Sequence, residues 1–108
     1  MIVFQIDASK SARHQAVWRD ALMGSDWSRF DPAGWAPLYD RVASVDSDDL
    51  EEAFELMNLW NDQSRVEMYA PTRSMSVGDV IIMNKEAYFC DTFGFIKLNV
   101  PAQAFFWN

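Results

Sequence analysis

The apolar positions near the start of the chain predict a strand followed by a helix. Residues Ile2–Ile6 gather β-branched and aromatic side chains, which is typical of a strand. From Ser11 onward, Val17 and Ala21 follow helical spacing. Gly24 then stands where the C-terminal cap of a helix belongs, so we expect a helix of about three turns.

The middle of the chain predicts a loop, a strand and the start of a second helix. Trp and Phe side chains stand among turn-forming residues from Ser25 to Pro37, which indicates an irregular loop held by aromatic contacts. The stretch from Leu38 to Val45 is compatible with a short strand. Asp46 or Ser47 is expected to cap the next helix, because acidic residues follow in its first turn.

This second helix is expected to be amphipathic. One face carries apolar residues at helical spacing, namely Leu50, Ala53, Phe54 and Met57. The opposite side carries carboxylates, namely Asp48, Glu51, Glu52 and Glu55. We therefore expect the apolar face to pack on the core and the acidic face to point outward.

The last third of the chain predicts antiparallel strands. A turn at Val77–Gly78–Asp79 precedes the fully apolar segment Val80–Met83, which is typical of a strand buried on both faces. Asn84–Lys85–Glu86 is expected to connect it to a partner strand at 87–90. Alternation resumes at Ile96–Lys97–Leu98. These segments predict a three-stranded antiparallel meander.

The elements together predict an α+β fold. A small antiparallel sheet, made of the C-terminal meander and the N-terminal strand, is expected to pack with two helices. At 108 residues, the chain is expected to form a single domain spanning 1–108.

Composition narrows the possible environment. No apolar run is long enough for a membrane span, and the N-terminus lacks the pattern of a signal peptide, so we expect a cytoplasmic protein. Cys90 is the only cysteine, which rules out an intramolecular disulfide and a cysteine zinc cluster within one chain. We expect no metal and no cofactor.

The net charge of −7 is concentrated in one segment. Between Val42 and Ser64 there is no Lys or Arg, and the acids there are Asp46, Asp48, Asp49, Glu51, Glu52, Glu55 and Asp62. This distribution argues against direct binding of nucleic acid, which requires a basic patch. It fits either a solvated helix face or an acidic surface for a basic protein partner.

Two groups of residues are candidates for partner binding. The first is the set of acids on the helix, Asp48, Glu51, Glu52 and Glu55. The second is the C-terminal run Phe105, Phe106 and Trp107, which either folds back on the core or forms an interface such as that of a homodimer.

Few residues are candidates for chemistry. His14 lies on the polar side of the first expected helix, which favours a solvated histidine over a catalytic base. Cys90 follows Phe89 in an expected strand, where a cysteine usually acts as a small buried apolar residue. Asp79 and Asp91 could pair to bind a metal or run acid and base chemistry, but carboxylates beside turns more often cap backbone amides.

Three segments carry a resemblance to a known family. They read DDLE at 48–51, RSMSVGDV at 73–80 and YFCDTFGF at 88–95. Together they resemble the YodL-like domain, in which an acidic helix precedes a strand of S-L-S-V-S-D-V-V type and a Y-x-x-D-S-x-G-F hairpin. The likeness covers about residues 45–98, and Gly78 departs from it because the family pattern has Ser there. The resemblance implies a small accessory protein of a phage, plasmid or conjugative element, and it implies no catalytic residues.

Two functional hypotheses follow. The first is a noncatalytic module of a phage or mobile element that binds a basic protein surface, in the host cytoplasm if phage-encoded, and so counters host defence or helps take over the host. The second is a small hydrolase or ligand-binding domain with a cleft lined by Asp79, Asp91, Tyr88 and Trp residues. An enzyme should bring at least two of Asp79, Asp91, His14 and Cys90 within hydrogen-bonding reach.

Overall fold

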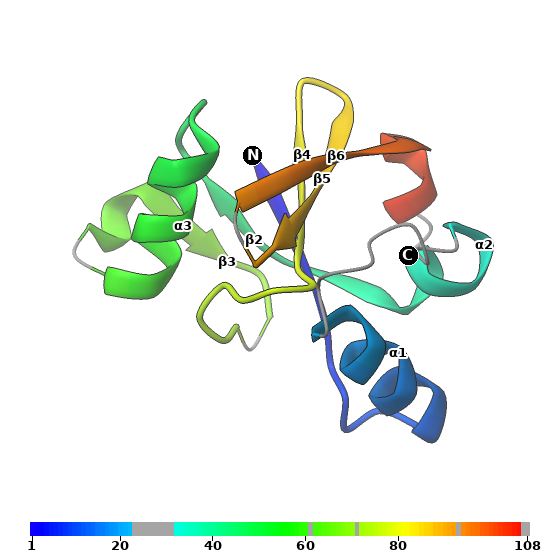
Figure 1. The fold of residues 1–108 in the computed structure, drawn as a ribbon. Coiled ribbons are helices and arrows are strands. Elements are labelled where there is room, and N and C mark those ends of the chain that lie inside the picture. Colours follow the sequence, from blue (N-terminus) through cyan, green and yellow to red (C-terminus); the bar gives the residue numbers. More distant parts are fainter. Residues whose placement is uncertain (23–31, 61, 71, 93, 107–108) are drawn as a thin grey trace.

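A six-stranded antiparallel sheet lies at the centre of the protein (Figure 1). The computed structural model describes residues 1–22, 32–60, 62–70, 72–92 and 94–106. The strands are β1 (Ile2–Ile6), β2 (Tyr39–Val45), β3 (Val66–Met68), β4 (Val80–Met83), β5 (Glu86–Asp91) and β6 (Gly94–Pro101). Their order across the sheet is β3-β2-β1-β4-β5-β6, so the N-terminal strand lies in the middle.

Helical segments cover both faces of the sheet. The α-helices are α1 (Ala12–Leu22), α2 (Pro32–Trp35) and α3 (Leu50–Leu59). The 3₁₀ turns are η2 (Ala36–Leu38), η3 (Gln63–Arg65) and η4 (Ala102–Phe105). In Figure 1, α3 lies on one side of the molecule, whereas α1, α2 and the C-terminal turn lie on the other. The predicted α+β class, with a small antiparallel sheet and packed helices, is confirmed.

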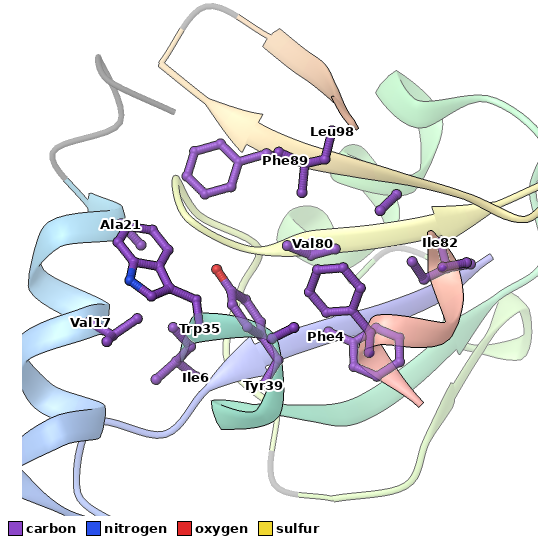
Figure 2. Close-up of a cluster of buried hydrophobic side chains, with 14 residues drawn as sticks. Phe4, Ile6, Val17, Ala21, Trp35, Tyr39, Val80, Ile82, Phe89 and Leu98 are labelled. Atoms are coloured by element: carbon purple, nitrogen blue, oxygen red, sulfur yellow. The ribbon is translucent and has the colours of Figure 1, made fainter. Parts of the chain in front are cut away.

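Successive side chains of β1 point to opposite faces of the sheet, and the core is accordingly divided into two clusters. Phe4 and Ile6 pack with α1, α2 and the C-terminal turn in the cluster shown in Figure 2. Val3 points to the opposite face and packs with α3. In β4, Val80 and Ile81 likewise go to different clusters, and both are fully buried. The prediction that Val80–Met83 is buried on both faces is therefore confirmed for its first three residues.

The boundaries of α3 differ from the prediction. The capping residue is Asp49, whose Oδ1 accepts hydrogen bonds from the backbone amides of Glu51 at 2.9 Å and Glu52 at 3.5 Å. Asp46 and Ser47, the predicted caps, lie before it, because the chain leaves β2 at Val45 and needs a short turn before the helix can begin. A carboxylate at the N-cap satisfies amides that have no partner inside the helix.

The hairpin between β4 and β5 is tighter than predicted. Asn84 and Lys85 alone form the connection, with positive φ angles of 52° and 66°, and Glu86 already pairs with Met83. Two positive φ angles are typical of the hairpin turns that match the twist of the flanking strands.

The loop predicted at 25–37 is only partly described by the structure. Its residues 25–31 lie outside the described residues, and its residues 32–37 belong to α2 and η2. Gly24, the predicted cap of the first helix, also lies outside the described residues.

Candidate functional site

Glu52 is paired with Arg65 at the surface of the molecule. Its Oε1 accepts hydrogen bonds from Ser47 Oγ at 2.7 Å and from Arg65 Nη2 at 2.5 Å. These bonds, first that of Ser47 and then that of Arg65, lower the pKa of the Glu52 carboxyl below its ordinary value. The same guanidinium donates to the backbone oxygen of Asp46 through Nε at 3.0 Å. Glu52 therefore links α3 to its flanking turns, and its carboxylate already has a cation beside it.

The other predicted acids remain available on the outer side of α3. Asp48, Glu51 and Glu55 are exposed, and none of them has an ion pair within the described part of the chain. Phe54 lies among them and is 38% exposed, although its spacing predicted a buried position. Its ring packs edge to face on Phe95, with 6.5 Å between the ring centroids. We call Asp48, Glu51, Phe54 and Glu55 the α3 surface.

The C-terminal aromatic residues do not share one environment. Phe105 is 2% exposed and packs on Phe4, with ring centroids 5.7 Å apart. Its predicted role in partner binding is therefore corrected, because the 3₁₀ turn η4 folds this ring back into the core. Phe106 is 45% exposed and contacts Phe4 edge to face at 5.3 Å. Trp107 lies outside the described residues.

Asp79 is the centre of a buried polar network. The side chain is 1% exposed, and its carboxylate forms an ion pair with Arg73 Nη2 at 2.8 Å. It also accepts hydrogen bonds from the amide of Ser76 at 2.9 Å and from Gln5 Nε2 at 3.1 Å. Burial raises the pKa of Asp79, and the Arg73 guanidinium opposes that rise. The predicted amide cap is present, and the additional donors give this carboxylate a structural role.

The remaining candidates for chemistry do not form a site with Asp79. His14 Nδ1 is hydrogen-bonded to Ser11 Oγ at 2.7 Å at the start of α1. Asp91 accepts a hydrogen bond from the adjacent amide of Thr92. Cys90 is buried, and burial raises the pKa of its thiol to about 12. Asp79, Asp91, His14 and Cys90 all lie in the described part of the chain, and no side-chain hydrogen bond joins any two of them.

A hollow of about 870 Å³ lies at the start of β2, and its lining includes Gln5 and Arg73, which bond to Asp79. We call it the β2 hollow. It is lined by residues 4–10, 39–42, 69–70, 72–73 and 105–106, together with Trp18. No sequence pattern indicates this hollow, because its lining comes from segments far apart in the chain that only the sheet order brings together. Of the residues predicted for a carboxylate-lined cleft, neither Asp79, Asp91 nor Tyr88 lines it.

The described residues contain neither a metal-binding cluster nor a membrane-spanning helix. No group of three or more His, Cys, Asp or Glu side chains lies close enough together there to hold a metal ion. None of the helices in those residues has the length and apolar character needed to cross a membrane.

Comparison of the chain with protein-family models, with curated proteins and with solved structures found no match.

Proposed function

We propose that this protein is a noncatalytic interaction module of a phage or mobile element, and that it binds a basic protein surface through the α3 surface. Within the host cytoplasm, such binding would serve to counter host defence or to take over host machinery. The resemblance of residues 45–98 to the YodL-like domain supports the genomic context of this proposal.

The observation that carries the proposal is the exposed ring of Phe54 between carboxylates without ion pairs. Glu51 and Glu55 are one helical turn apart, so they lie on the same side of α3. Neither is neutralised by a cation of the described residues, in contrast to Glu52. An aromatic ring surrounded by charge of one sign suits a partner that offers an apolar group flanked by Lys or Arg.

The alternative, a small hydrolase or ligand-binding domain with a carboxylate-lined cleft, receives less support. Its proposed carboxylates are used elsewhere, since Asp79 binds Arg73 inside the protein and Asp91 binds a neighbouring amide. A nucleophilic role for Cys90 requires a thiolate, which a pKa of about 12 disfavours at neutral pH.

A charge-reversal experiment tests the proposal. The double variant Glu51→Lys/Glu55→Lys should capture at least about tenfold less partner than the wild type, because like charges would then face each other across the interface. Capture is measured by affinity pull-down from lysate, followed by titration of the partner identified in this way. Phe54→Ala should weaken the same interaction without changing the net charge.

The matched control is Asp20→Lys/Glu67→Lys. Both residues are exposed and lie outside α3, on α1 and β3, and the change in net charge is the same. Thermal unfolding of every variant shows whether the fold is retained. If the two double variants capture the partner equally, net charge rather than the α3 surface governs binding, and the proposal is wrong.

A further inference from the structure

Two of the exposed aromatic side chains of the protein border the β2 hollow. Tyr69 is 46% exposed and Phe106 is 45% exposed, and both belong to the lining. Phe106 packs edge to face on the buried ring of Phe4, so part of the floor is a rigid apolar surface. A bound planar molecule would remove these exposed rings from water, which is favourable in proportion to the apolar area covered.

Arg41 is the lining cation that remains available for an anion. Lys10 is paired with Asp40 at 2.5 Å, and Arg73 is paired with the buried carboxylate of Asp79 at 2.8 Å. Arg41 has no carboxylate partner in the described residues, and its guanidinium carbon lies 5.1 Å from the centroid of the Tyr69 ring. Stacking on an aromatic ring orients a guanidinium and leaves its planar donors able to bind an oxyanion.

The carboxylate of Asp7 is the other charged group of the lining without an ion pair in the described residues. It accepts hydrogen bonds from the amide and the hydroxyl of Ser9, at 3.0 Å and 2.6 Å, in the loop after β1. These bonds, that of the hydroxyl first, lower the pKa of Asp7, so the group is ionised at neutral pH. In the sheet, Arg41 pairs with Phe4, whereas Asp7 follows Ile6 beyond the end of β1, so the two charges lie at different ends of the hollow. An anion would therefore bind at the end that holds Arg41.

From this arrangement we propose that the β2 hollow binds a small planar organic anion, with its ring against Phe106 and Tyr69 and its acidic group on Arg41. The volume of about 870 Å³ falls in the range of small-molecule sites, and the lining combines apolar rings with a few polar groups, as such sites do. The proposal concerns a site different from the α3 surface, and it does not depend on the proposed function.

Two fluorescent dyes test the proposal. Anilinonaphthalene sulfonate carries a planar naphthalene ring and an anionic sulfonate, and N-phenylnaphthylamine has the same ring system without the charge. Arg41→Gln should weaken binding of the sulfonate dye about fivefold and leave the uncharged dye unchanged, because only the sulfonate accepts from the guanidinium. Phe106→Ala should weaken both dyes about fivefold, because the ring surface is lost.

Controls separate this site from the rest of the molecule. Arg13→Gln removes an exposed cation on α1 outside the hollow and should change neither dye, and Glu51→Lys/Glu55→Lys should also change neither. Thermal unfolding in the absence of dye confirms that each variant is folded, and Tyr69→Ala replaces Phe106→Ala if that variant unfolds. The proposal is overturned if neither dye shows saturable binding, or if Arg41→Gln and Arg13→Gln bind the sulfonate dye with equal affinity.

Discussion

Gln5 is a polar residue in the middle of the apolar strand β1, and buried Asp79 explains its presence. Gln5 is 4% exposed, and its Nε2 donates to Asp79 and to the backbone oxygen of Arg73 at 3.0 Å. Its Oε1 accepts from the backbone amide of Arg73. Buried polar groups are tolerated when they are hydrogen-bonded, and no buried side-chain N or O atom of the described residues lacks a partner.

At the same scale, the environment of Cys90 predicts an unreactive thiol. The residue is 3% exposed and the pKa of its thiol is raised to about 12, first by burial and then by the charge of Asp79. At pH 8, we expect dithiobis-nitrobenzoate to react with the folded protein at least about a hundredfold more slowly than with the protein in urea, because the thiolate is the reactive form. Similar reaction rates of the folded and the urea-unfolded protein would show an accessible Cys90 thiolate and would support a nucleophilic role for this residue.

Among the elements, the contact between α1 and the turn before β4 explains an unusual glycine. Gly78 has a φ of +98°, and a Cβ atom placed there would lie 2.8 Å from the Cβ atom of Ala21. The YodL-like pattern has Ser at this position. A side chain at position 78 would collide with α1. The close packing of α1 on this turn therefore requires glycine at position 78.

A double-mutant cycle measures this coupling. Gly78→Ala should destabilise the protein by about 3 kcal/mol, from the positive φ and the close contact together. Ala21→Gly should cost about 1 kcal/mol in the helix, but it removes the opposing methyl group. We therefore expect the double variant to be more stable than the sum of the single effects by about 1 kcal/mol in urea unfolding. Strict additivity would show that the contact with the Ala21 methyl group contributes nothing to the effect.

The elements also show which features the sequence could predict. Ile2–Ile6 and Val80–Met83 were predicted with the correct ends, because a short apolar run between turns is a local signal. The edge strand Val66–Met68 was missed, since it is short and Glu67 and Met68 are exposed. The pairing of Glu52 with Arg65 depends on how the chain turns back after α3, and the β2 hollow depends on contacts between distant segments; local patterns record neither.

For the whole molecule, the two proposed surfaces have different locations, and only the β2 hollow offers a cation without a carboxylate partner in the described residues. The α3 surface lies over one face of the sheet, where Val3 and Ala53 belong to the same core cluster. The β2 hollow is bordered by Phe4 and Phe106. Phe4 belongs to the core cluster on the other face (Figure 2). A protein with a net charge of −7 thus keeps a stacked, unneutralised guanidinium away from its acidic helix. This separation would allow a partner protein and a small anion to be bound at the same time.

The central position of β1 has a consequence for how the protein is made. β1 precedes the other five strands of the sheet in the chain and pairs with β2 on one side, but its other neighbour is β4, and Gln5 bonds to Asp79 across 74 positions of sequence. Pairing between such distant segments carries a large entropic cost and slows folding. We expect a chain that ends at Met68 to be unfolded by circular dichroism, since β1 would lack β4 on one edge. A folded fragment would instead show that residues 1–68 can complete a core without β4, β5 and β6.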